Sequence, residues 1–292
     1  MTRVGVLGPG GVGGVVAARL ARAGHEVVIV AAERTAATIA ARGLHFTGPE
    51  WSWEGALEAR SSLVEPVDVL VIATKAMDLP TALQRVPSGL LGGTVVVPLL
   101  NGVDHVPYLR AMLPGVEVVA SSISVEATRH RPGVVEQVSG FCDVGVSLAG
   151  GGGQRWAGLA EEAGCAVTTF PDDATVLWRK LSFLAPLALL TTSAGAPIGE
   201  AIRLQPGAVG PIVAEATTAA AAFGVRVDPD AIEQRLRALP EGMQSSMLKD
   251  LIGGRAVELD AIAGPVIRAL GSDRAPATVG AVRAILGREA PS

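Results

Sequence analysis

Short apolar runs alternate with helical stretches through the first 170 residues. The N-terminal run begins at Val4 and breaks at the glycine-rich segment 8–13. Residues 15–23 are alanine-rich with apolar positions at helical spacing, Gly24 offers a helix C-cap, and residues 25–30 have the pattern of a second buried strand. The first 30 residues therefore predict a strand, a glycine turn, a helix and a strand.

The same alternation continues after residue 30, because apolar β-branched runs are separated by stretches of helical composition. The predicted strands are residues 67–73, 94–100, 117–120, 134–138, 142–148 and 166–170, and the predicted helices are residues 35–42, 79–85 and 154–163. This order predicts a doubly wound parallel sheet. We expect strands 134–138 and 142–148 at its edge, and a surface turn over the glycines at 150–153.

The alternation stops near Pro171, and the remaining pattern is predominantly helical. We therefore predict an α/β fold with two domains. Residues 1–170 form a Rossmann-type dinucleotide-binding domain, and residues 171–292 form an all-helical domain for substrate binding and dimerisation. The apolar, alanine-rich segment 214–223 is a candidate helix for a homodimer interface, although the oligomeric state stays open.

Composition narrows the function classes. The 292 residues are 49% hydrophobic and 18% charged, enough to bury a core without disulfides or metal. No stretch approaches 18 uninterrupted apolar residues, which argues against a membrane span. The net charge of −4 and the lack of a basic block argue against nucleic acid or an anionic membrane as partner. A small-molecule ligand is favoured.

The N-terminus and the cysteines predict a cytoplasmic location. The chain runs straight into its first predicted strand, which leaves no room for a signal peptide. Cys142 and Cys165 have neither metal-ligand spacing nor an adjacent histidine cluster. We interpret them as two buried thiols in a reducing compartment, and we expect no metal site.

The segment 8–13 has the G-x-G-x-x-G spacing of a dinucleotide-binding turn. In such a turn the first glycine permits the tight bend, the second lets the main chain approach a pyrophosphate, and the third lets the helix pack closely on the strand. The phosphates then lie at a helix N-terminus, where free N–H groups favour negative charge. The cofactor-binding candidates here are Gly8, Gly10, Gly11, Val12 and Gly13.

Two further candidates follow predicted strands, where ligands of open α/β sheets bind. Lys75 comes after strand 67–73, and Asn101 comes after strand 94–100. A loop lysine is commonly just solvated, and Asn-Gly is commonly only a turn. Their position at the rim of a cofactor site makes a functional role worth testing.

The helical half holds a lysine in an unusual setting. Lys180 follows Arg179 inside an otherwise apolar segment. It could be a lysine that snorkels from an apolar face. It could also be a proton donor, because desolvation beside Arg179 would lower the pKa of Lys180. Ser246 and Glu258 lie in a later polar cluster, where Glu258 could equally be an ordinary solvated carboxylate.

Taken together, these segments resemble the ketopantoate reductase (2-dehydropantoate 2-reductase) family. The resemblance covers nearly the whole chain. It rests on the ordered segments 8–13, 74–76, 100–103, 131–135, 178–181 and 245–247, with Glu258 twelve residues after Ser246. It implies a Rossmann domain followed by a helical domain, with NADPH-dependent reduction of 2-dehydropantoate, a small 2-oxo acid of pantothenate biosynthesis, in a cleft between the two.

The resemblance also implies residue roles. Lys180 would be the general acid that gives a proton to the substrate carbonyl as hydride arrives from the nicotinamide. Glu258 would hold the active-site network and a substrate hydroxyl, and Ser246 would bind the substrate carboxylate. Asn101 and Lys75 would line the cofactor and the reaction centre. These roles fit the chemistry, because carbonyl reduction builds negative charge on oxygen.

Two positions depart from the family pattern on the helix that carries Lys180. Leu184 and Ala188 stand four and eight residues later, where the family usually has asparagines that bind substrate. This leaves a related 2-hydroxy or β-hydroxy acid dehydrogenase with another substrate as an alternative. A non-catalytic dinucleotide-binding regulator is a further alternative. The presence of Lys180, Ser246 and Glu258 argues against it, because a pure sensor needs neither a proton donor nor a substrate clamp.

The cofactor also remains a choice between two dinucleotides. Ala32 stands where the family generally places an arginine for the 2′-phosphate of NADP. Arg34 could serve that purpose from two residues away, whereas Glu33 could bond a ribose hydroxyl, as in NAD enzymes. We expect NADP with Arg34 as its contact, and NAD is the alternative.

Overall fold

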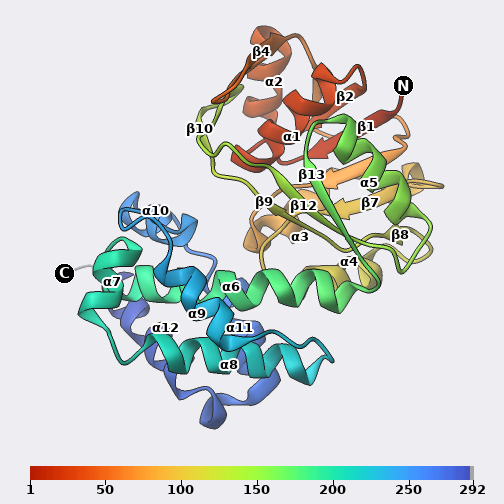
Figure 1. The fold of residues 1–292 in the computed structure, drawn as a ribbon. Helices are drawn as coiled ribbons and strands as arrows, with labels where there is room; N and C mark the ends of the chain where they lie inside the picture. The colour runs from red at the N-terminus through yellow and green to blue at the C-terminus, as the bar shows by residue number, and fades with distance from the viewer. Residues whose placement is uncertain (290–292) are drawn as a thin grey trace. The chain divides into compact units, whose positions relative to one another are not determined.

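The computed structural model describes residues 1–289, which fall into two compact units (Figure 1). The N-terminal unit comprises residues 1–100 and 105–176. The C-terminal unit comprises the short segment 101–104 and the chain from residue 177 onward. Asn101 thus belongs to the same unit as Lys180 and Glu258.

A parallel six-stranded sheet forms the centre of the N-terminal unit, with strand order β5-β2-β1-β6-β7-β8. Its strands are β1 (Arg3–Leu7), β2 (Glu26–Val30), β5 (Glu58–Arg60), β6 (Val69–Ile72), β7 (Val95–Pro98) and β8 (Glu117–Val118). Every residue of β6 and β7 is buried, as expected for parallel strands covered on both faces. The α/β fold with a Rossmann-type parallel sheet is confirmed.

The helices of this unit connect its strands. They are α1 (Gly11–Arg22), α2 (Glu33–Arg42), α3 (Leu79–Leu83), α4 (His105–Met112) and α5 (Gly152–Glu162), with short 3-10 turns at Ala76–Asp78 and Ser88–Leu90. The predicted surface turn at 150–153 is wrong in its second half, because Gly152 and Gly153 are buried and begin α5. A Cβ atom on Gly153 would lie 2.2 Å from the Ser147 carbonyl oxygen, so only glycine lets α5 start there.

Two smaller sheets lie beside the main one. The first has strand order β10-β11-β3-β4 and the second β13-β12-β9. Their strands are β3 (Leu44–Thr47), β4 (Ser52–Gly55), β9 (Ser121–Ser124), β10 (Ala127–Arg131), β11 (Val134–Gln137), β12 (Asp143–Ser147) and β13 (Ala166–Phe170). The prediction that strands 134–138 and 142–148 extend the main sheet is therefore wrong. A strand's own pattern shows which face is buried but not which partner it pairs with.

The first small sheet packs on α1, which also contacts β1 and β2 of the main sheet. A Cβ atom on Gly14 of α1 would lie 2.4 Å from Cγ2 of Val135 in β11. Part of the glycine content at the start of α1 therefore lets a second sheet approach the helix. Sequence spacing alone gave no indication of this packing.

The regular secondary structure of the C-terminal unit is all helical in the described residues, as predicted (Figure 1). Its helices are α6 (Asp173–Ala194), α7 (Ile198–Leu204), α8 (Val209–Ala222), α9 (Pro229–Arg237), α10 (Ser246–Ile252), α11 (Leu259–Leu270) and α12 (Pro276–Glu289), with a 3-10 turn at Ser272–Arg274. Helix α8 packs against α9, α11 and α12 and buries most of its apolar residues there. Packing within the unit thus explains the buried apolar face of this helix. A role of the segment 214–223 in a homodimer interface stays a prediction.

Helix α6 is long and apolar enough to cross a membrane on length and composition alone. In the structure, 67% of its most apolar window is buried inside the protein. The core helix of a globular unit passes the same test, so this helix is weak evidence for a membrane span. Polar residues interrupt the apolar run of α6, so its sequence contains no 18 uninterrupted apolar residues.

Candidate active site

Three predicted site residues form one hydrogen-bonded chain in the C-terminal unit. The Lys180 Nζ donates to the Asn101 Oδ1 at 3.0 Å. The Asn101 Nδ2 donates to the Glu258 Oε2 at 3.1 Å. The amide of Asn101 therefore bridges a cation and a carboxylate, and it fixes both side chains at one place.

The local fold explains why Asn101 reaches the other two. It follows the buried residues at the end of β7, and Gly102 after it has φ +88°. A Cβ atom on Gly102 would lie 2.4 Å from the carbonyl oxygen of Ala261 in the first turn of α11. Glu258 is the N-cap residue of the same helix. The Asn-Gly pair is thus a turn that also brings the asparagine against the start of α11.

Burial lowers the pKa of Lys180 to about 8, and the negative charge of Glu258 opposes this shift. The prediction that Arg179 contributes to the lowering is not supported, because the Arg179 side chain is exposed and burial is the cause. At neutral pH the ammonium form prevails, yet it releases its proton far more readily than an ordinary lysine. The group is suited to donate a proton to a developing oxyanion.

Ser246 lies apart from this hydrogen-bonded chain, at the first position of α10, with an exposed side chain. The residue before it, Ser245, is buried and caps α10 by accepting from the Leu248 N–H at 3.0 Å. The Ser245 hydroxyl also hydrogen-bonds the Thr191 hydroxyl of α6 at 2.7 Å. Sequence reasoning assigned no role to Ser245 or Thr191, although they attach the Ser246 turn to α6.

Lys180 and Thr191 lie eleven residues apart on α6, which places them on the same face of the helix, about 16 Å apart along its axis. Leu184 and Ala188 share this face between them. Leu184 is partly exposed and Ala188 is buried. The helix face that joins the lysine to the serine turn is therefore apolar between its two polar ends.

The glycine loop forms the second group of predicted site residues, in the N-terminal unit. Gly8 has φ +90°, and α1 begins at Gly11 with neither a side-chain cap nor an acidic residue in its first turn. A Cβ atom on Gly13 would lie 2.2 Å from the Gly8 carbonyl oxygen, whereas one on Gly10 would meet no atom within 4 Å. Uncapped N–H groups at residues 11–13 and the open side of Gly10 suit a dinucleotide pyrophosphate.

Lys75 follows Thr74, and Thr74 packs against the glycine loop. A Cβ atom on Gly8 would lie 2.7 Å from the Cγ2 of Thr74, so the end of β6 and the glycine turn are in close packing. The Thr74 hydroxyl is buried and has no hydrogen-bond partner among the described residues. A buried hydroxyl without a partner beside the loop is a candidate contact for a polar ligand group.

Arg34 is the second residue of α2 and lines a cavity of about 270 Å³. Arg42 and Arg131 also line this cavity, and the described residues offer no carboxylate to any of the three. Nearby Glu54 and Glu136 pair with histidines instead. Three uncompensated guanidinium groups around one cavity favour an anionic ligand.

Comparison with known proteins gives a consistent result across both units. The model of "Ketopantoate reductase PanE/ApbA" matches residues 4–147, and that of its C-terminal domain matches residues 174–276. A 2-dehydropantoate 2-reductase from Mycobacterium tuberculosis is 30% identical over 280 residues, covering 91% of this chain and 90% of its own. The chain belongs to the ketopantoate reductase family.

The solved structures extend this likeness. A PanE/ApbA family ketopantoate reductase from Ralstonia eutropha is 26% identical, with a TM-score of 0.88 and 98% coverage of both chains. A D-mandelate dehydrogenase with bound NADH and anilino(oxo)acetate shares the fold at 22% identity, with a TM-score of 0.87 and 98% coverage of both chains. As a ketopantoate reductase family member, the chain is a pyridine-nucleotide-dependent oxidoreductase that acts on CH–OH groups.

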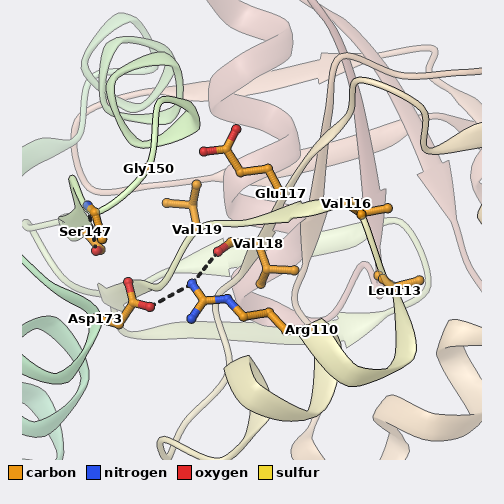
Figure 2. A pocket seen from close by; sticks show the side chains of 11 residues that line it. Arg110, Leu113, Val116, Glu117, Val118, Val119, Ser147, Gly150 and Asp173 are labelled. Carbon is orange, nitrogen blue, oxygen red and sulfur yellow. Dashed lines mark hydrogen bonds and ion pairs between the residues drawn. The ribbon is translucent and has the colours of Figure 1, made fainter.

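A larger cavity, of about 500 Å³, lies elsewhere in the N-terminal unit of this family member (Figure 2). Arg110 reaches into it, pairs with Asp173 at 2.7 Å and donates to the Val118 carbonyl at 2.8 Å. Glu117 accepts from the Gly152 N–H at 2.7 Å. No predicted site residue lines this cavity and these charged groups are satisfied, so we assign it no ligand. The side chains of residues 1–288 also include no group of three or more His, Cys, Asp or Glu that could hold a metal ion.

Proposed function

We propose that the protein reduces a small 2-oxo acid with NADPH and that Lys180 is the general acid. Ketopantoate is the leading candidate substrate. The observation that carries the proposal is the hydrogen-bonded chain Lys180–Asn101–Glu258, with bonds of 3.0 and 3.1 Å. A bound nicotinamide would supply the hydride. The side chains then have to orient the carbonyl and to neutralise the charge that develops on its oxygen.

Each of the three hydrogen-bonded residues has a distinct role in the proposed reaction. The ammonium of Lys180 points a proton at the carbonyl oxygen and releases it as the alkoxide forms. Asn101 occupies one donor direction of that ammonium and leaves the others for substrate. Glu258 keeps the lysine largely protonated, because its negative charge raises the pKa that burial lowers. Its carboxylate is also an acceptor for a substrate hydroxyl.

Ser246 is the proposed contact for the substrate carboxylate. Its side chain is exposed, and Ser245 rather than Ser246 caps α10. The bond between Ser245 and Thr191 fixes the distance from the Ser246 hydroxyl to the α6 face. A Ser246→Ala variant should raise KM for the oxo acid more than it lowers kcat.

For the cofactor, the arginine-lined cavity supports NADP over NAD. Arg34 contributes to a site with two further guanidinium groups, which suits a phosphate better than a ribose hydroxyl. Binding calorimetry with NADPH and NADH tests the choice. Arg34→Ala should weaken NADPH binding and leave NADH binding unchanged, whereas Glu33→Ala should leave NADPH binding unchanged. Loss of NADH affinity in Glu33→Ala would instead assign NAD.

The direct test of the reaction is loss of NADPH absorbance with ketopantoate and purified protein. Turnover supports the proposal, and absence of turnover with both NADPH and NADH would remove ketopantoate as substrate. Cofactor binding without turnover on any 2-oxo acid would make the protein a dinucleotide-binding regulator.

A second substrate class is favoured by one observation, the apolar α6 face at Leu184 and Ala188. A hydroxyl-bearing substrate such as ketopantoate finds no hydrogen-bond partner at these positions, while an aliphatic or aryl side chain would be compatible. A panel of 2-oxo acids with branched aliphatic, aryl and hydroxylated side chains separates the two. If the apolar acids have the higher kcat/KM, Leu184→Asn should shift the preference toward ketopantoate.

A further inference from the structure

The two cysteines of the chain lie side by side in the second small sheet of the N-terminal unit. Cys142 directly precedes β12 and Cys165 directly precedes β13. Their sulfur atoms are 3.2 Å apart. The sequence alone predicts two buried thiols, whereas the fold brings them into contact and leaves Cys165 partly exposed.

The backbone holds the pair in this position from both sides. The strands β12 and β13 are parallel, with Asp143 opposite Ala166, so the two cysteines are the next opposed pair. The Ala166 N–H donates to the Cys142 carbonyl at 2.9 Å, and the Cys165 N–H donates to the Ala160 carbonyl at 2.9 Å. Neighbouring strands are about 4.8 Å apart, within the Cα spacing that disulfides span. A bond of about 2.05 Å therefore requires mainly side-chain movement.

The surroundings distinguish the two sulfurs. A hydrogen bond from the Cys165 thiol lowers the pKa of Cys142, burial opposes this, and the positive charge of Arg19 adds to the lowering. The same pairing and burial raise the pKa of Cys165. Cys142 is 5% exposed, whereas Cys165 opens partly to solvent. The pair thus combines a favoured thiolate with an accessible second thiol.

We propose that Cys142 and Cys165 are a redox modification site, which a peroxide converts from a dithiol into an intrachain disulfide. The Cys142 thiolate attacks one peroxide oxygen, the O–O bond breaks, and a sulfenic acid and hydroxide form. The Cys165 sulfur then attacks the sulfenic sulfur, and a second hydroxide leaves. Each sulfur loses one electron, the peroxide gains two, and with the protons taken up the products are one disulfide and two waters.

The site is connected to the helix that carries the glycine loop. Arg19 of α1 donates to the Gly164 carbonyl at 3.0 Å and to the Ala163 carbonyl at 3.3 Å, next to Cys165. It also donates to the Gln137 side chain at 2.9 Å. A disulfide would close the chain from residue 142 to 165 over these contacts, so the oxidised protein should unfold at a higher temperature than the reduced one.

Thiol counting tests the proposal cleanly, because the chain has only two cysteines. The reduced full-length protein is treated with hydrogen peroxide, quenched and unfolded, and its thiols and intact mass are measured. We expect loss of both thiols, a mass lower by two hydrogen atoms, a monomer on a non-reducing gel, and full reversal by dithiothreitol.

Cys142→Ser and Cys165→Ser are the matched variants. Each should fold like the reduced wild type by circular dichroism, lack the two-hydrogen mass loss and show no rise in Tm after peroxide. Retention of both thiols in wild type, addition of oxygen without loss of hydrogen, or crosslinking between chains would overturn the proposal. If a serine variant fails to fold, the wild-type mass and thiol count still decide it.

Discussion

The glycine loop of the N-terminal unit and the Lys180 chain of the C-terminal unit are built in different ways. The loop presents backbone groups from six consecutive residues, and close packing excludes a side chain at Gly13, where a Cβ atom would lie 2.2 Å from the Gly8 carbonyl oxygen. The Lys180 chain consists of side chains from three segments: Lys180 and Asn101 are 79 positions apart in the sequence, and Asn101 and Glu258 are 157 positions apart.

This contrast separates two kinds of sensitivity. A backbone site is lost when a side chain is added, since the added atoms displace the chain or the ligand. A side-chain site is lost when atoms are removed, because charge and hydrogen bonds disappear while the fold remains. Substitutions in the glycine loop should therefore lower cofactor affinity or stability, whereas substitutions in the Lys180 chain should lower turnover.

The largest effect is expected at Lys180. Lys180→Ala removes the proposed proton donor, and kcat should fall by about 10² to 10⁴-fold, the range that general acid catalysis contributes. Cofactor binding by calorimetry should stay unchanged, because the glycine loop belongs to the other unit. Steady-state kinetics and calorimetry on one preparation check both statements.

The matched control is Arg179→Ala, the neighbouring cation on the same helix with an exposed side chain. Its kcat should stay close to wild type. Equal losses in the two variants would attribute the effect to general positive charge, and normal turnover in Lys180→Ala would remove the proposed general acid.

In the glycine loop, adding one methyl group should have position-dependent effects. Gly13→Ala should destabilise the protein by about 1–3 kcal/mol, since its Cβ would meet the Gly8 carbonyl oxygen. Gly10→Ala meets no atom within 4 Å and should fold normally, yet bind dinucleotide more weakly. Thermal unfolding and cofactor titration measure the two effects. Unchanged cofactor affinity in Gly10→Ala would contradict the proposed pyrophosphate position.

A smaller loss is expected at Asn101. Asn101→Ala leaves the lysine and the carboxylate in place but removes the amide between them, and hydrogen bonds to charged groups are worth about 1.5–3 kcal/mol. The loss in kcat should thus be about 10 to 100-fold. Asn101→Asp is a useful companion, because an acceptor remains for Lys180 while the donor to Glu258 is gone. Wild-type turnover in both would show that the bridge does not position the acid.

The same contrast explains what could be predicted from the sequence. The parallel sheet and the helical second half follow from local periodicity. The hydrogen bonds of Lys180 join residues far apart in sequence, so only the family resemblance pointed to them. The pattern at 134–138 predicts a strand but not its partner, since partner choice depends on packing against α1, which places this strand in the first small sheet.

Three other features could not be predicted from the sequence, because each depends on how distant segments pack together. Gly152 and Gly153 are typical of a turn, yet they begin a helix. A Cβ atom would meet Val95 at Gly152 and the end of β12 at Gly153. Cys142 and Cys165 lie 23 residues apart without motif spacing, and only the pairing of β12 with β13 brings them together. The buried Thr191 and Ser245 bond likewise depends on α6 meeting the start of α10.

The most direct test of the central claim is the pH dependence of kcat/KM for oxo acid reduction, compared between wild type and Glu258→Gln. In the proposed mechanism the protonated lysine is the active form, so wild-type activity should decline above a pH of about 8, where Lys180 loses its proton. Glu258→Gln removes the charge that raises this pKa, so the decline should begin at lower pH. A decline at the same pH in both proteins would contradict the account, as would its persistence in Lys180→Ala.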